Sequence, residues 1–233
     1  MEGDEGSGTR ERIVAAALRL LAEGGRDAVS TRAVGAAAGV AAPTLYRLFG
    51  DKEGLLDAVA RHGFATYVAE KTARVPSGDP VEDLRAGWDL HVELGLEHPA
   101  LYALMYADPR PGTASPAAAA ATRVLAEHIH RVAQAGRLRV GEGLAAALVH
   151  AAGSGTTLSL IATPPARRDP SLSPAAREAV LAAITTDASP SAAPGAVGAA
   201  VALRAVLADT DALSGPEQAL MTEWLDRIAR AAG

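Results

Sequence analysis

The side chains best suited to bind a polyanion lie close together near the start of the chain. Hydroxyl, amide and basic groups bind phosphate oxygens and base edges of nucleic acids. Residues 9–74 contain ten basic and seven acidic groups, a net charge of +3, whereas the whole chain carries −5. Each basic group alone would fit an ordinary solvated surface, but their grouping favours a phosphate-bearing partner. The candidate contact residues are Thr31, Arg32, Ala42, Pro43, Thr44, Tyr46, Arg47 and Lys52.

Short helices must position these groups. Five apolar residues at helical spacing predict an amphipathic helix over 9–22 that is closed by Gly24 and Gly25: Ile13, Ala16, Ala17, Leu20 and Leu21. Ser30 is a suitable N-cap for a second helix over 31–38, which Gly39 ends. In this second helix, Val34 and Ala37 are predicted to face inward.

A third helix follows after only a few residues. Pro43 suits its first turn, and Gly50 ends it. Asp51 can cap the next helix, which runs from Lys52 to about Lys71. Two short helices joined by a tight glycine-containing turn, with a longer helix behind them, indicate a helix-turn-helix, whose second helix enters the major groove of DNA.

The stretch from Ser30 to Val59 resembles the DNA-binding signature of the TetR family of transcriptional regulators. It reads STRAVGAAAGVAAPTLYRLFGDKEGLLDAV. The resemblance implies that Tyr46 and Lys52 meet backbone phosphates, that Thr44 lies at the DNA face, and that Leu45 and Phe49 are core positions. It also implies a homodimer on a palindromic, double-stranded operator.

One position departs from the family pattern. Ala41 stands where family members often have Ser or Thr, and alanine cannot cap a helix. Its presence should cost about 1 kcal/mol of helix-end stability. Ala42 and Pro43 offer no hydrogen bond from their side chains, so apolar contact with a thymine methyl is one available mode of base recognition.

Composition predicts an all-α fold, with the helix-turn-helix domain followed by a larger helical domain. Alanine dominates, aromatic residues make up 3%, and no run alternates as a half-buried strand would. The expected parts are an acidic flexible tail (1–8), the DNA-binding domain (9–74) and a regulatory and dimerisation domain (75–233). The chain has no cysteine, which excludes disulfides and thiolate metal sites. The acidic start lacks a secretory signal, so a cytoplasmic protein is expected.

A long uncharged stretch lies between Glu142 and Arg167. Its many glycine, serine and threonine residues, and the prolines at its end, favour a buried core helix over a membrane span. We therefore expect no membrane association.

Aromatic residues gather early in the larger domain. They either fill a core or line a pocket for a small apolar effector. The run GWDLHVELGLEHPALYALMY is similar to the start of the regulatory domain in some actinobacterial TetR-type proteins. Few basic groups occur near these aromatic residues, whereas Asp89 and Glu93 are close to them in sequence. We therefore expect an uncharged or weakly cationic ligand. The candidate ligand-binding residues are Trp88, His91, Val92, Tyr102, Met105 and Tyr106.

The last two helical segments both carry a broad apolar stripe. Family resemblance implies that the last long helices build the dimer, although the stripes could also pack within one subunit. The candidate interface residues are Val201, Leu220, Trp224, Leu225 and Ile228.

Enzyme and metal chemistry find little support in the sequence. The glycine runs near 141 and 153 do not complete a nucleotide-binding or nucleophile motif. His91 and His98 are two helical turns apart, and His128 and His130 point to different faces, so no metal and no cofactor are expected. The alternative to a regulator is a helical enzyme or small-molecule-binding protein with an incidental helix-turn-helix-like segment.

Overall fold

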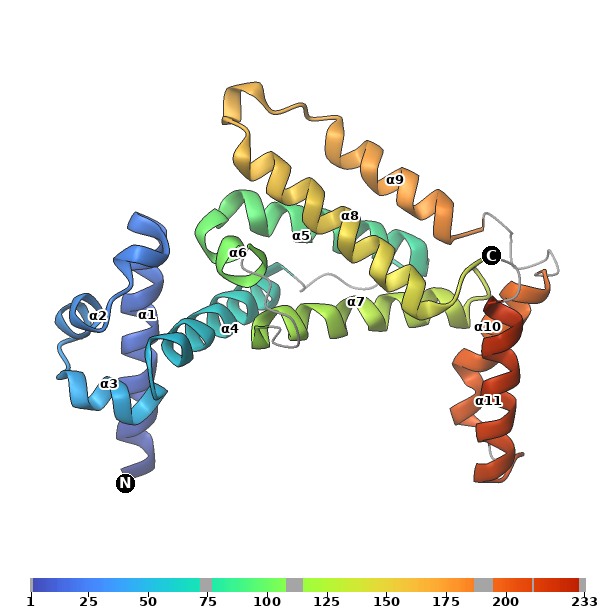
Figure 1. Cartoon of the computed structure of the whole chain (residues 1–233), viewed down its shortest axis with the longest axis horizontal. Helices are drawn as coiled ribbons and strands as arrows, with labels where there is room; N and C mark the ends of the chain where they lie inside the picture. The colour runs from blue at the N-terminus through green and yellow to red at the C-terminus, as the bar shows by residue number, and fades with distance from the viewer. Residues whose placement is uncertain (1, 72–76, 108–114, 187–194, 211, 231–233) are drawn as a thin grey trace. The chain divides into compact units, whose positions relative to one another are not determined.

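The computed structural model describes residues 2–71, 77–107, 115–186, 195–210 and 212–230, and these residues form helices joined by short connections (Figure 1). Within these ranges the only β contact is a single bridge between Leu138 and Thr185, so the all-α prediction is confirmed. The α-helices are α1 (Glu2–Ala28), α2 (Thr31–Ala38), α3 (Ala42–Phe49), α4 (Lys52–Lys71), α5 (Pro80–Glu97), α6 (Pro99–Tyr106), α7 (Pro116–Gln134), α8 (Glu142–Ala162), α9 (Leu172–Ile184), α10 (Ala196–Val206) and α11 (Gly215–Arg230).

The chain divides into two compact units. The first comprises Met1–Val75 and Glu93–Ala121, and the second comprises Pro76–Val92 and Thr122–Gly233. The sequence-based boundary at residue 75 puts residues 93–121 in the second domain, whereas in this division they group with the first unit. Packing of α6 explains the difference, because a Cβ on Gly63 of α4 would lie only 2.9 Å from Leu101 of α6. The glycine thus leaves room for the leucine side chain.

Helix α1 forms the centre of the first unit's core. Ile13, Ala16, Ala17 and Leu21 are buried, as their spacing predicts, whereas Leu20 is only half-buried. Helix α1 contacts α2, α4 and α6. The helix starts at Glu2, so residues 2–8 are helical where a flexible tail was expected. Extending a helix that has already nucleated adds a hydrogen bond per residue at little cost. The predicted end at the glycine pair appears as a kink, with Gly25 at φ +67°.

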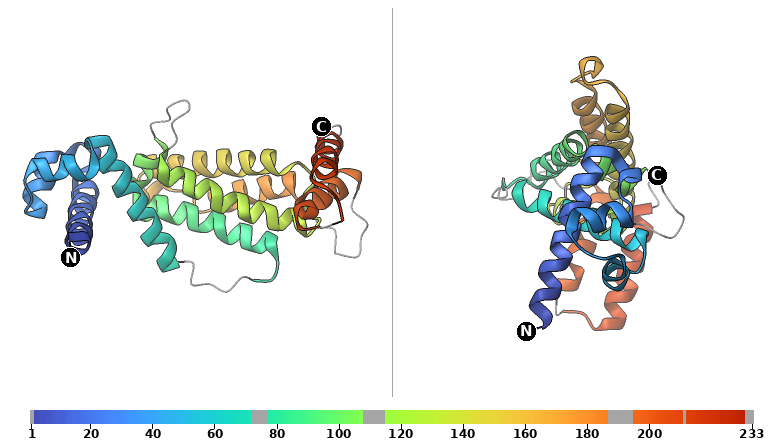
Figure 2. Two further views of the ribbon diagram at one scale, coloured as in Figure 1. Left: turned by 90° about the horizontal axis from the view of Figure 1, so that it is seen from below. Right: turned by 90° about the vertical axis from the view of Figure 1, so that its left-hand side faces the viewer.

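The second unit contains two helical hairpins, α8 with α9 and α10 with α11 (Figure 2). Helix α8 buries one face, which includes Ala145, Val149 and Gly153. Its opposite face is exposed at Leu144 (55%) and Leu148 (39%). The expectation of a buried core helix is therefore met on one face only, because the opposite face of α8 is exposed among the described residues.

Helix α8 is also long and apolar enough to cross a membrane by length and composition, with a mean hydropathy of 1.4 in its most apolar window. Only 28% of that window is buried. A single helix of this kind is weak evidence for a membrane span, since core helices of globular proteins pass the same test.

Candidate nucleic-acid interface

Helix α2 is capped at both ends, and its C-terminal cap leads into the turn to α3. The Ser30 hydroxyl accepts a hydrogen bond from the Ala33 N–H at 3.1 Å, which confirms the predicted N-cap. At the other end Gly39 adopts φ +66°, and the Val40 N–H donates to the Gly35 carbonyl at 2.9 Å. A Cβ on Gly35 would lie 2.9 Å from the Val40 carbonyl oxygen. Glycine at position 35 therefore permits the chain to fold back tightly on α2.

Helix α3 presents a sharply divided surface. Leu45 (2% exposed) and Phe49 (9%) are buried, in agreement with their predicted core positions. Between them Tyr46 is 53% exposed, and Arg47 is exposed as well. The N-cap residue Ala41 makes no side-chain capping bond, as predicted, and its carbonyl accepts from the Thr44 N–H at 3.0 Å.

The predicted nucleic-acid contacts lie at the starts of α2 and α4 and along α3. Helix α3 packs against both α2 and α4, so these elements form one continuous part of the first unit. Ala37, predicted to face inward, is exposed, because the short helix α2 buries only Val34 and Gly35. The structure leaves Arg32, Ala42, Pro43, Tyr46 and Arg47 exposed, and Thr31, Thr44 and Lys52 half-buried.

A second tight connection sets the start of α4. The Asp51 carboxylate accepts a hydrogen bond from the Gly54 N–H at 2.8 Å, which confirms the predicted cap. A Cβ on Gly54 would lie only 2.1 Å from the Phe49 carbonyl oxygen. The first turn of α4, with Lys52, is thereby held directly against the end of α3.

Arg10 is a positioning residue that the sequence did not reveal. Its Nη1 donates to the Leu48 carbonyl at 2.9 Å, and its guanidinium lies 4.5 Å from the centre of the Phe49 ring. The end of α3 therefore receives both a hydrogen bond and a cation–π contact from α1. Nothing in the spacing of Arg10 distinguishes it from other surface arginines on α1.

Arg26 was also missed. Its Nη2 donates to both carboxylate oxygens of Glu53 on α4, at 2.7 and 2.9 Å. Both side chains are partly exposed, so the pair contributes little stability, but it joins the end of α1 to the start of α4.

The predicted ligand-binding residues fall in both units, and the ligand site itself stays a prediction. In the second unit Trp88 and Val92 are buried, and the Trp88 Nε1 donates to the Ser173 Oγ at 3.1 Å. Burial, followed by the nearby His150, lowers the pKa of His91 to about 4, so its imidazole is neutral at pH 7. These three residues lie on α5.

The other three lie on α6 in the first unit. Tyr102 and Met105 are buried there, and the Tyr102 and Tyr106 rings lie 4.6 Å apart. Burial, followed by the neighbouring Tyr102, raises the pKa of Tyr106. The hydroxyl of Tyr106 is therefore neutral throughout the physiological pH range.

The predicted dimer residues differ in exposure. Leu220 (46%), Trp224 (51%) and Ile228 (44%) are exposed on α11. Val201 and Leu225, in contrast, are buried within the second unit. Their side chains therefore support the hairpin from inside, and any role in a dimer contact would be indirect.

Acidic and histidine side chains do not form a metal centre in the part of the chain that the structure describes. No group of three or more His, Cys, Asp or Glu residues converges there. Tyr67 and His98 instead make an edge-to-face ring contact at 5.7 Å, and Glu93 and Glu97 lie close to the Tyr67 hydroxyl.

Comparison with known proteins finds a family model that matches the N-terminal helices and solved structures that share the fold. Residues 13–59 match the model for bacterial regulatory proteins of the tetR family. A protein of unknown function from Rhodococcus sp. RHA1 is similar in structure, with 24% identity, a TM-score of 0.63 and coverage of 76% of this chain and 96% of the other. RolR, crystallised with its ligand resorcinol, gives 21% identity, a TM-score of 0.61 and coverage of 78% and 90%.

A third solved structure is NalD from Pseudomonas aeruginosa, the secondary repressor of the MexAB-OprM multidrug efflux pump. It is 19% identical, with a TM-score of 0.53 and coverage of 79% of this chain and 100% of NalD. None of the curated protein sequences matches the chain. The chain has the fold of a TetR-type transcription regulator. Its N-terminal segment is a tetR-family helix-turn-helix domain, as the resemblance of Ser30–Val59 predicted.

Proposed function

We propose that this protein is a ligand-responsive transcriptional repressor that binds a palindromic operator as a homodimer, and that it is not an enzyme. The observation that carries the proposal is the divided surface of α3, where Leu45 and Phe49 are buried while Tyr46 and Arg47 face outward. A helix held in this way can enter a major groove with its polar side toward the bases. A DNA-binding role also places the protein in the cytoplasm.

The DNA contacts divide into two kinds. Tyr46 and Lys52 bind phosphates and set the register of the helix on the duplex. Thr44 and Arg47 reach base edges, and Ala42 with Pro43 contacts thymine methyl groups. Thr31 and Arg32, at the start of α2, add contacts to the flanking backbone.

The effector is a small, largely apolar and uncharged molecule. Each unit offers its own aromatic candidates for contact with it, Trp88 and His91 on α5 in the second unit and Tyr102 and Tyr106 on α6 in the first. Asp89, a possible partner for a cationic ligand, already pairs with Arg177. The neutral imidazole of His91 likewise offers no charge. RolR, whose structure contains resorcinol, supports small-molecule binding by this fold.

Two close contacts connect α6 to the DNA-binding helices. Leu101 of α6 packs against Gly63 of α4, and Gly54 of α4 packs against Phe49 of α3. A ligand that displaces α6 would therefore move α4 and with it the recognition helix. To release DNA, the ligand must bind the displaced conformation more tightly than the DNA-bound one.

Dimerisation follows from the small size of the recognition helix, because two copies spaced one helical turn apart read enough base pairs for specificity. The exposed face of α11 formed by Leu220, Trp224 and Ile228 is one candidate surface. The exposed leucines of α8, Leu144 and Leu148, form a second one. Either face leaves apolar area in solvent that a second copy would bury.

Electrophoretic mobility shift with DNA from upstream of the protein's own gene tests the function. A salt-sensitive shift that footprints as two symmetric half-sites is the expected result. Random DNA of equal length serves as the control. Equal binding to both, at all salt concentrations, would contradict a sequence-specific regulator.

A further inference from the structure

Helix α9 is anchored unevenly along its length. Its two buried residues, Leu181 and Ile184, are both in the C-terminal half. Side chains from Leu172 to Ala179 are exposed or only half-buried. Apolar burial therefore anchors the C-terminal half of α9 more strongly than the N-terminal half.

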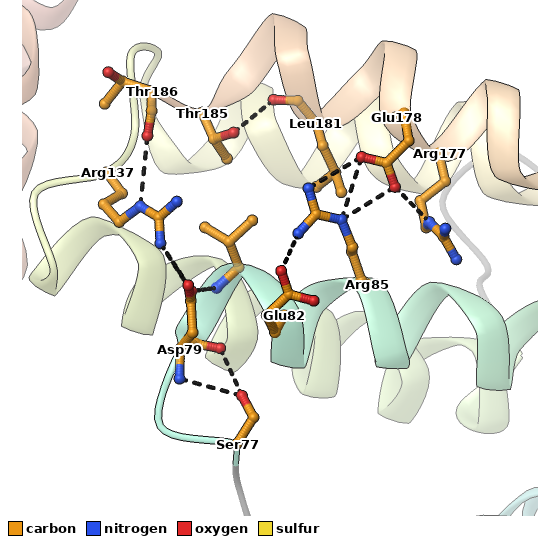
Figure 3. A network of polar contacts seen from close by, with 11 residues as sticks. Ser77, Asp79, Glu82, Arg85, Arg137, Arg177, Glu178, Leu181, Thr185 and Thr186 are labelled. Carbon is orange, nitrogen blue, oxygen red and sulfur yellow. Dashed lines mark hydrogen bonds and ion pairs between the residues drawn. The ribbon is translucent and has the colours of Figure 1, made fainter. Parts of the chain in front are cut away.

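Polar contacts join the N-terminal half of α9 to α5, and Figure 3 shows one of them, the pair between Arg85 and Glu178. Arg85 donates from Nε to the Glu178 Oε1 at 3.0 Å and from Nη2 to Oε2 at 3.0 Å. Arg177 pairs with Asp89, and the Trp88 Nε1 donates to the Ser173 Oγ at 3.1 Å. We call these six residues the α9 latch: Arg85, Trp88 and Asp89 on α5, and Ser173, Arg177 and Glu178 on α9.

The α9 residues of the latch lie against an uncharged aromatic surface that includes Trp88 itself. Trp88 is only 5% exposed although it lies at the α5–α9 contact. Behind it α8 approaches closely, since a Cβ on Gly153 would lie 3.5 Å from the Trp88 ring and 3.6 Å from the His91 ring. This surface, formed by Trp88, His91 and Gly153, lies entirely within the second unit.

The ion pairs of the latch are well suited to break and re-form. The carboxylates are open to solvent, with side-chain exposures of 47% for Glu178 and 57% for Asp89. Exposed pairs of this kind add little stability, and salt screens them. The hydrogen bonds between Arg85 and Glu178 raise the pKa of the guanidinium and lower that of the carboxyl group, so both partners stay charged near neutral pH.

We propose that the N-terminal half of α9 is a lid over Trp88, closed by the α9 latch, whose opening admits a small uncharged ligand to the Trp88, His91 and Gly153 surface. The lid pivots about the buried Leu181 and Ile184. The proposal rests on the ligand control proposed above and gives it an entry route.

Acrylamide quenching of Trp88 fluorescence tests the lid without DNA or effector. The chain has two tryptophans, so Trp224→Phe leaves Trp88 as the only reporter. In this background Glu178→Gln should raise the quenching constant by about twofold or more, because the opened state becomes more populated. The control is Glu223→Gln, which removes an exposed carboxylate paired with Arg227 on α11.

Salt provides a readout that needs no change to the latch. Raising sodium chloride should increase quenching of Trp88 in the Trp224→Phe protein and have less effect once Glu178 is Gln. Equal quenching constants in the Glu178→Gln and Glu223→Gln proteins, or no response to salt, would overturn the lid. Loss of DNA binding or absence of an effector would instead contradict the regulator and leave the lid result unaffected.

Discussion

Gly54 and Phe49 approach more closely than any side chain would allow. A Cβ at position 54 would lie 2.1 Å from the Phe49 carbonyl oxygen, far closer than the 3.0 Å below which Cβ atoms in proteins essentially never approach another atom. The atom opposite is backbone, so it cannot move away by a change of rotamer. The tight connection between α3 and α4 therefore requires glycine, which has no Cβ, at position 54.

Gly54→Ala should therefore destabilise the first unit, by about 2–4 kcal/mol, because the clash forces α3 and α4 apart. DNA affinity should fall as well, since Lys52 and Tyr46 lose their relative positions. Thermal unfolding and mobility shift measure the two effects. Gly8→Ala is the matched control, because nothing lies within 4 Å of a Cβ there, and it should be neutral or slightly stabilising.

Lys52→Ala should weaken binding about equally on specific and random DNA. If Lys52 holds one phosphate, the slope of log affinity against log salt should decrease by about one contact. Arg167→Ala removes the same charge from an exposed position in the second unit and should leave the slope unchanged. An unaltered slope for Lys52→Ala would remove this residue from the phosphate contacts.

Arg47→Ala should change preference between sequences. An arginine at a base edge contributes about 1–3 kcal/mol of discrimination, and this is lost when the donor is removed. Thr44→Val, which keeps the shape and removes the hydroxyl, should act in the same direction but less strongly. Selection of binding sites from a random pool measures the preference. Unchanged selected sequences would show that neither side chain reads bases.

The free energy of unfolding should decrease as the pH is lowered below about 6.5. Burial, and secondarily His150, lowers the pKa of His91 from 6.5 to about 4, so the unfolded chain binds more protons than the folded one between these values. The free energy of unfolding should be highest above about pH 6.5 and decrease by up to about 3 kcal/mol as pH falls toward 4. Urea unfolding at several pH values of the His91→Gln protein should show a flatter dependence. The control His62→Gln changes an exposed histidine and should leave the pH dependence of stability as it is in the unmodified protein.

Paired variants separate the two candidate dimer faces. Trp224→Glu with Leu220→Glu places charge on the exposed face of α11, and Leu144→Glu with Leu148→Glu does so on α8. Burying unpaired carboxylates is costly, so whichever pair covers the interface should yield monomers in sedimentation. If both double variants dimerise as the unmodified chain does, neither face forms the interface.

The ends of the helices in the first unit were predictable because single residues of a characteristic type mark them. Ser30, Gly39 and Asp51 each end or begin a helix by their own chemistry, and the structure has them in those roles. The inward positions of Leu45 and Phe49 followed from the family resemblance. Ala37 was misplaced because alanine fits either face of a short helix equally well.

Contacts between distant segments were not predictable. Arg10 meets Leu48, and Arg85 meets Glu178 ninety-three positions away, and no local pattern marks such pairs. The close approach of Gly54 depends on the path of the turn before it. The broad stripes of the last helices likewise did not reveal that Leu225 faces the interior and Trp224 the solvent.

The start of the recognition helix has a consequence for modified DNA. Ala41, Ala42 and Pro43 are all exposed, and none of their side chains donates or accepts a hydrogen bond. Such an apolar tip distinguishes bases only through the methyl groups that it touches. 5-Methylcytosine carries its methyl group at the same ring position as thymine. A 5-methylcytosine at the contacted base pair would therefore offer Ala42 and Pro43 the same methyl group that thymine does. Cytosine methylation of the operator should then strengthen this contact instead of blocking it.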